Sequence, residues 1–202
     1  MDFENSPIVL LDADVLYKYT TRSLIFELAF LEAIKPRWTQ EITNEAISNL
    51  AKINTNWADN LKRNLKYVQD SFPGSSIGSK LVDGIVNNEG TLHGVHIKDQ
   101  HVAAAAIVAK ADALITGNLR DFALETLTAF GIDLFSPDQF FSQLAKTNPK
   151  VLASAIALQL NDFKNPTLSI NDYADYLLKA GCSETAKWVQ ANAGVIQRLT
   201  GQ

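Results

Sequence analysis

The sequence Ile8-Val9-Leu10-Leu11-Asp12-Ala13-Asp14-Val15-Leu16 decides the fold, because two acids interrupt a run of branched apolar residues. Such a run predicts a buried strand that ends in carboxylates. Ligands of open α/β sheets bind at the carboxyl ends of the strands, so Asp12 and Asp14 emerge where a substrate or a cation would meet them. A single acid at this place also fits a simpler role, in which it caps a turn or the following helix.

The composition predicts one domain with a sizeable core and at most a small appendage. The chain has 202 residues, of which 47% are hydrophobic, with only 6 Pro and 10 Gly. The single cysteine, Cys182, excludes an internal disulfide and fits a reducing compartment, although a small buried apolar side chain explains it equally well. The formal net charge of −4 argues against a broad nucleic-acid-binding surface but allows a local basic rim.

The N-terminus is acidic and lacks the basic-then-apolar plan of a signal peptide. No uncharged apolar run reaches membrane-spanning length. We therefore expect a soluble, cytoplasmic protein that has no membrane partner.

Apolar strands alternate with amphipathic helices along most of the chain, which predicts a three-layer α/β fold with a mostly parallel central sheet. After a break at residues 17–21, the expected helices lie around 24–31, 42–50, 57–72, 81–86, 103–110, 124–130 and 137–144. Further expected strands are 113–116 and 132–135, whereas 35–39 predicts a turn or a short strand before a helix capped by Thr39.

No strand is evident beyond residue 147. The stretches 151–160, 170–178 and 186–195 predict three helices, with Pro166 and Gly181 as breaks. We therefore divide the chain into an α/β domain at residues 1–146 and a small all-α C-terminal extension at residues 147–202. The extension is either an appendage packed on the main domain, which we favour, or a partner-binding segment.

The acids expected at the ends of elements or near the crevice are Asp12, Asp14, Glu45, Asp99 and Asp121. Several carboxylates around one crevice cannot all be ionised without a compensating cation, so a cluster of them predicts Mg²⁺ or Mn²⁺. With a phosphodiester as substrate, such an ion activates water and neutralises developing charge. Structural alternatives remain open, since Asp99 also favours its helix dipole, Glu45 also suits a solvated surface and Asp121 also suits a helix cap.

Four blocks of the chain resemble the PIN-domain nucleases, and the VapC-type toxin ribonucleases among them, in order and approximate spacing. The blocks are residues 8–16, 37–45, 98–105 and 111–122, and the tail resembles the helical extension of one VapC-like subgroup. The resemblance implies a Mg²⁺- or Mn²⁺-dependent endoribonuclease, the toxin of a type II toxin–antitoxin pair. It also implies an RNA substrate, a cognate antitoxin and a homodimer.

The resemblance also assigns roles to single residues. Asp12, Glu45 and Asp99 match the three most regular metal-site acids of the family. The fourth acid usually follows the threonine by two residues, and this chain has Asn118 there. An amide oxygen binds a cation or orients water without adding charge, so either Asp121 substitutes as a metal ligand or the site holds only one metal well.

Two further residues are expected to support the ligands without touching the metal. Thr116 resembles the hydroxyl that braces this network in the family, and Asp14 occupies a place where many members carry Asn.

Basic and histidine residues permit several roles. Arg22, Lys98 and Arg120 are expected to grip RNA phosphates, although each also suits a solvated charge or an ion pair. The basic helix face formed by Lys62, Arg63 and Lys66 favours ordinary solvation over an RNA track. Surface or packing roles are expected, rather than zinc binding, for the three histidines, His93, His96 and His101.

Two other functions compete with the nuclease. Residues 11–16 and 114–116 also resemble the first two motifs of haloacid-dehalogenase-like phosphatases. That family needs a Lys and then a metal-binding acid pair after the Thr, but no strand-terminal acid pair is found there, and Glu45 and Asp99 would be unused. A catalytically weak PIN domain that binds RNA or a partner would explain Asn118 and the acidic charge. The joint presence of Asp12, Glu45 and Asp99 favours the enzyme.

Overall fold

The computed structural model describes residues 5–88, 90–163 and 167–200, which fall into two compact units. The sheet unit comprises Pro7–Tyr17 and Lys35–Ser136, and the helical unit comprises residues 5–6, Lys18–Ile34 and the chain from Pro137 onward. In the described ranges, none of the helices is both long and apolar enough to span a bilayer. The division of the chain at residue 146 stays a prediction.

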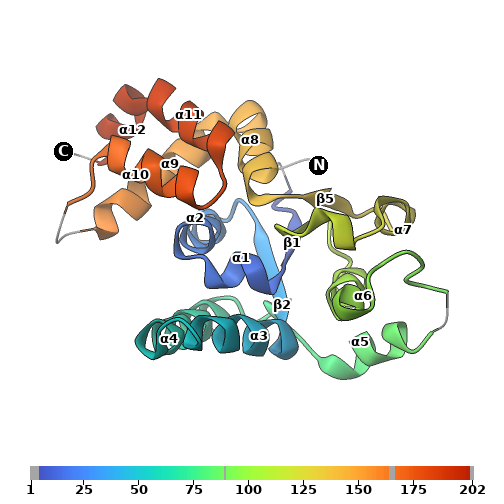
Figure 1. Ribbon diagram of the computed structural model, residues 1–202. Coiled ribbons are helices and arrows are strands. Elements are labelled where there is room, and N and C mark those ends of the chain that lie inside the picture. Colours follow the sequence, from blue (N-terminus) through green and yellow to red (C-terminus); the bar gives the residue numbers. More distant parts are fainter. Residues whose placement is uncertain (1–4, 89, 164–166, 201–202) are drawn as a thin grey trace. The chain divides into compact units, whose positions relative to one another are not determined.

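The sheet unit contains a five-stranded sheet in the order β3-β2-β1-β4-β5, and every neighbouring pair is parallel (Figure 1). Its strands are β1 (Ile8–Leu11), β2 (Lys35–Thr39), β3 (Ser76–Ile77), β4 (Ala113–Ile115) and β5 (Asp133–Phe135). The expected α/β class with a parallel central sheet is therefore confirmed, and so are helices in the C-terminal part of the chain.

The central strand β1 lies where the strand order reverses. Val9 pairs with Pro36 of β2 on one side and with Ala113 of β4 on the other. The amide of Asp12 continues the β1–β4 ladder by donating to the carbonyl of Ile115 at 3.1 Å. In open parallel sheets the ligand crevice forms at the carboxyl ends of the strands at such a reversal, so the residues after β1 and β4 face it.

Helices flank this sheet. They are α1 (Ala13–Tyr17), α3 (Gln40–Ala51), α4 (Thr55–Ser71), α5 (Ser79–Val86), α6 (Gln100–Val108) and α7 (Leu124–Ala129), with 3₁₀ turns η1 (Ile97–Asp99) and η2 (Leu119–Asp121). The alanine-rich α6 packs against β1 and β4, and the small side chains of Ala103–Ala106 are fully buried there. Thr39 caps α3, as predicted, by accepting a hydrogen bond from the amide of Ile42.

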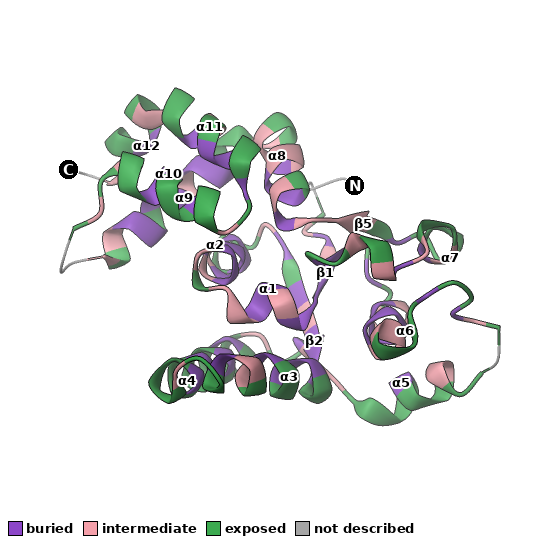
Figure 2. Ribbon diagram, viewed as in Figure 1, coloured by how far each residue is buried: buried purple, intermediate pink, exposed green. Residues whose placement is uncertain are grey.

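The helical unit contains α2 (Tyr19–Phe30), α8 (Pro137–Thr147), α9 (Pro149–Asp162), α10 (Ile170–Lys179), α11 (Ser183–Ala191) and α12 (Ala193–Thr200). The helix α2 packs against α9 and α10, and its buried stripe includes Leu24 and Leu28 (Figure 2). The fully buried hydroxyl of Tyr173 donates to Gln159 at 2.6 Å, which satisfies a polar group that would otherwise be costly inside this core.

Several predicted boundaries are wrong. The first strand ends at Leu11, and Val15 and Leu16 belong to α1, because the carbonyl of Asp12 accepts from both of their amides and starts a helix at once. The break expected at 17–21 is Lys18, whose extended backbone separates α1 from α2. Asp99 was expected in the first turn of the alanine-rich helix. It instead lies in η1, directly before that helix begins at Gln100.

The expectation of three tail helices is also wrong. The predicted helix at 186–195 is two helices, because α11 ends at Ala191 and Asn192 stops it by donating from its side chain to the carbonyl of Trp188. The strand β3 was not predicted, because its two residues are too few to show a pattern. The expected break at Pro166 lies outside the described residues.

Candidate active site

Asp12 is held rigidly at the end of β1. Its side chain is only 6% exposed, and both carboxylate oxygens accept hydrogen bonds. The hydroxyl of Thr116, the first residue after β4, donates to Oδ2 at 2.7 Å, and the amide of Ala13 donates to Oδ1 at 2.6 Å. Thr116 in turn accepts from the amide of Asn118 at 3.0 Å, so one hydroxyl joins the acid to the loop after β4.

The environment of Asp12 favours its protonated form. Burial is the main cause that raises its pKa from 3.8 to about 6, the carboxylates of Asp14 and Glu45 raise it further, and the bonds from Thr116 and Ala13 act in the opposite direction. A buried carboxylate with acidic neighbours is an arrangement that a cation relieves.

Asp14 is tied to the same loop by a different bond. Its Oδ2 accepts from the amide of Gly117 at 2.9 Å, which links α1 to the residue after Thr116. The contact with backbone suits the supporting role expected for Asp14, which stays a prediction.

An acidic pocket of about 630 Å³ lies in the sheet unit and is lined by half of the predicted site residues. Glu45 comes from α3, Asp99 from η1, Asn118 from the loop after β4 and Asp121 from η2. The pocket is lined by Glu41, Glu45, His96, Lys98, Asp99, His101, Asn118 and Asp121. Asp12 is outside this lining set, but its pKa responds to the charge of Glu45.

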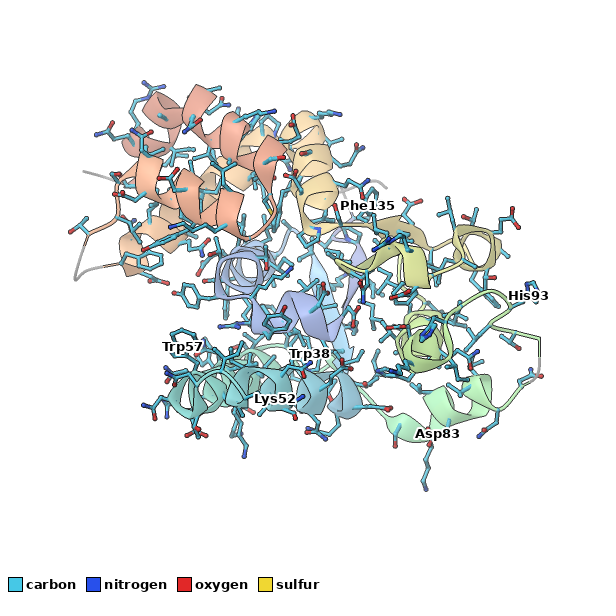
Figure 3. The ribbon with its side chains drawn as sticks, in the orientation of Figure 1. Trp38, Lys52, Trp57, Asp83, His93 and Phe135 are labelled. Carbon is cyan, nitrogen blue, oxygen red and sulfur yellow. The ribbon has the colours of Figure 1, made fainter. Side chains whose placement is uncertain are left out.

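Two histidines belong to this pocket. The Nδ1 atom of His96 lies 3.2 Å from Oδ2 of Asp99, and Nε2 of His101 lies 3.9 Å from Oε2 of Glu45. The Nε2 atom of His101 is buried and has no hydrogen-bond partner among the described residues. His93 is exposed at the outer surface of the sheet unit (Figure 3).

Sequence reasoning gave no site role to His96, His101 or Glu41. Glu41 had a usable signal, because it precedes Glu45 by four residues and therefore shares its face of α3. The histidines had none, since the loop before η1 decides where His96 points.

The predicted phosphate-binding residues do not all lie at the pocket. Lys98 lines it, and Arg120 is exposed in η2 but is not among the lining residues. Arg22 belongs to the helical unit, is 4% exposed and places its guanidinium 5.6 Å from the centre of the Tyr19 ring. Burial argues against a phosphate-binding role for Arg22, which stays an untested prediction.

The chemistry of the donor set fits a hard divalent cation. Carboxylate oxygens predominate, Asn118 offers an amide oxygen, and the unpartnered Nε2 of His101 is an additional donor. In the part of the chain that the structure describes, no three His, Cys, Asp or Glu side chains gather closely enough to hold an ion. The pocket side chains would therefore have to turn toward one another to bind one.

Comparison with protein families gives one finding. Residues 137–191 match the model of the VapC50 C-terminal domain. This match suggests that the chain is related to VapC-family proteins through its C-terminal helices. It lies in the helical unit and includes none of the candidate site acids, while the parallel sheet is compatible with a PIN domain. Comparisons with curated proteins and with solved structures gave no match.

Replacing Thr116 by Val tests the bond that holds Asp12. The variant keeps the shape of the side chain but removes a donor to a buried carboxylate, so we expect a loss of about 1–3 kcal/mol in the free energy of unfolding at pH 7.5. The loss should be smaller at pH 5, where more of Asp12 is protonated. Thr116→Ser keeps the hydroxyl, so this variant should retain most of the wild-type free energy of unfolding. Urea denaturation of the metal-free protein measures both values, and equal losses at the two pH values would contradict the assignment.

Proposed function

We propose that this chain is a Mg²⁺- or Mn²⁺-dependent endoribonuclease, the toxin of a toxin–antitoxin pair, acting in the cytoplasm as a homodimer. The observation that carries the proposal is the buried Asp12 at the reversal of the strand order, with a pKa raised first by burial and further by the charges of Asp14 and Glu45. The VapC50 C-terminal match in the tail supports it independently, because that match rests on other residues.

The residues that would hold the cation are Asp12, Glu45 and Asp99, with Asn118 and Asp121 beside them. A divalent cation at such a site lowers the pKa of bound water and neutralises charge on a phosphodiester. The hydrogen bond from Thr116 holds Oδ2 of Asp12 toward the loop after β4, and the hydrogen bond from the amide of Ala13 holds Oδ1. Hydrolysis by in-line attack of water would leave 5′-phosphate and 3′-hydroxyl ends, as the family resemblance implies.

The proposal also gives roles to the remaining pocket residues. Asp121 lines the same pocket as Asn118, so it is available to supply the charge that the amide lacks. Lys98 is exposed at the pocket and would bind a phosphate oxygen of the RNA, with Arg120 in the neighbouring η2 as a second cation.

The proposed partners are those that the resemblance to VapC-type toxins implies. An antitoxin segment is proposed to cover the acidic pocket, with an Arg side chain paired to its carboxylates. Light scattering at micromolar concentration tests the dimer, and a monomer would remove that part of the proposal.

Cleavage of total cellular RNA tests the proposed function. With Mn²⁺ or Mg²⁺ we expect shortened RNA, and with excess chelator we expect intact RNA. Steady hydrolysis of a small phosphomonoester without RNA cleavage would favour a haloacid-dehalogenase-like phosphatase. RNA binding without cleavage under every metal condition would favour a PIN domain that only binds.

A further inference from the structure

A second pocket of the sheet unit lies between α3 and α4 and has the opposite charge. This basic groove has a volume of about 470 Å³ and three cationic side chains, all from α4. It is lined by Trp38, Gln40, Thr43, Asn44, Ile47, Lys62, Arg63, Leu65, Lys66, Gln69 and Asp70. The buried Trp38 and Leu65 provide an apolar floor beneath the polar side chains.

The cations of the basic groove are available to an anion. Among the described residues, Lys62 has no acid within ion-pair distance, and Arg63 bonds to the neutral side chain of Asn60. Lys66 pairs with Asp70 at 3.0 Å, but both side chains are mostly exposed, so this pair is weak and a ligand can displace it. The groove therefore keeps positive charge on a chain whose net charge is −4.

Side-chain amides complete the groove on the α3 side. The amide nitrogen of Gln40 donates to Thr43 Oγ1 at 3.1 Å and to Asn44 Oδ1 at 2.9 Å. These bonds use the oxygen of Asn44, so its Nδ2 is the atom left to donate to a ligand. Ammonium and amide donors together suit phosphate oxygens.

One helix joins the basic groove to the acidic pocket. Glu41 and Glu45 of α3 line the acidic pocket, whereas Gln40, Asn44 and Ile47 of the same helix line the basic groove. An α-helix with its side chains is about 10–12 Å across, so a few nucleotides of single-stranded RNA suffice to pass from one flank of α3 to the other.

We propose that the basic groove binds the phosphate backbone of the RNA next to the bond that is cut, so that the strand crosses α3. This inference rests on the proposed function, because the strand enters the acidic pocket at its reacting phosphate. An acidic peptide is the less favoured occupant, since Glu41 and Glu45 on the other flank of α3 would repel its continuation. The same carboxylates would repel an RNA phosphate, but a cation bound in the acidic pocket would remove that repulsion.

Binding of a short RNA in chelator tests the groove without cleavage. A probe too short to extend from the basic groove into the acidic pocket avoids the carboxylates that lack a cation there. The probe is a fluorescent single-stranded RNA, and fluorescence anisotropy gives its dissociation constant at several salt concentrations. For Lys62→Ala combined with Lys66→Ala we expect affinity to fall by about tenfold and the slope of log affinity against log salt to decrease by about 1.4. The double variant Lys62→Arg with Lys66→Arg should keep both values.

The matched control is Lys35→Ala with Lys80→Ala, which removes two exposed lysines of the same unit that lie outside the groove. Unchanged RNA affinity and salt slope in the groove variant would overturn the inference, and if the wild type still cuts RNA, the proposed function survives. If RNA affinity depends on Lys62 and Lys66 but the wild type cuts no RNA, the groove would be an RNA-binding site and the proposed nuclease function would be overturned. Loss of binding to a polyglutamate peptide, with RNA binding unchanged, would assign the groove to an acidic protein and overturn the RNA proposal.

Discussion

Asp12→Asn is expected to abolish RNA cleavage and to stabilise the metal-free protein at neutral pH. Asn keeps both hydrogen bonds, because its oxygen accepts from the amide of Ala13 and its nitrogen donates to Thr116 Oγ1. It removes a charge whose burial, together with Asp14 and Glu45, raises the pKa of Asp12 from 3.8 to about 6. The variant therefore loses a candidate metal ligand and also an unfavourable charge.

The sign of the pH dependence follows from that pKa. The folded protein holds the Asp12 proton more tightly than the unfolded chain, so this group stabilises the fold below about pH 4 and the contribution is lost as pH rises through about 6. Asn does not titrate, so its stability advantage over wild type should grow by about 1–1.5 kcal/mol between pH 5 and pH 7.5.

Urea denaturation in chelator at the two pH values measures this difference. Asp59→Asn, which changes an exposed acid on α4, serves as the control and should show no such growth. An advantage of Asp12→Asn that is equal at pH 5 and pH 7.5 would show that Asp12 does not titrate in this range.

Asp99→Asn is expected to reduce cleavage by at least about a hundredfold while leaving the fold intact. The side chain of Asp99 makes no capping bond to α6, contacts His96 instead and lines the acidic pocket. Asn can keep the contact with Nδ1 of His96, because its side chain offers both a donor and an acceptor. The loss of a charge near a helix start changes stability by only about 0.3–1 kcal/mol.

Thermal unfolding separates the metal role of Asp99 from a structural one. Wild type should gain melting temperature when Mn²⁺ is added, because a ligand that binds only the folded state stabilises it, and Asp99→Asn should lose most of this gain. Asp83→Asn, at the outer surface of α5, is the control (Figure 3). Cleavage by Asp99→Asn at the wild-type rate would mean that Asp99 has only a structural role.

The parts of the fold that sequence predicted best are those specified locally. The apolar run before Asp12, the alanine-rich stretch of α6 and the cap at Thr39 each predict their element from neighbouring residues, and the parallel sheet follows from their alternation. The strand β3 escaped prediction because its two residues have no periodicity, and its pairing with β2 is a long-range contact.

The sequence also did not predict which segments form the helical unit. Residues 18–34 group with the chain from Pro137 onward, although α2 follows the first strand closely in sequence. The apolar stripe of α2 indicates that it is buried, but the partners α9 and α10 lie more than a hundred residues away. In the site, the position of His96 depends on the loop before η1, which has no regular pattern, whereas His101 lies in the first turn of α6.

Cleavage of one defined single-stranded RNA, labelled at its 5′ end, tests the central claim most directly. The purified protein is incubated with Mg²⁺, with Mn²⁺ or with excess chelator, beside Asp99→Asn prepared in the same way, and the chemistry of the new ends is determined. The account predicts cleavage by wild type with metal only, with 5′-phosphate and 3′-hydroxyl ends. Undiminished cleavage in chelator, or new ends that carry a 2′,3′-cyclic phosphate, would contradict it.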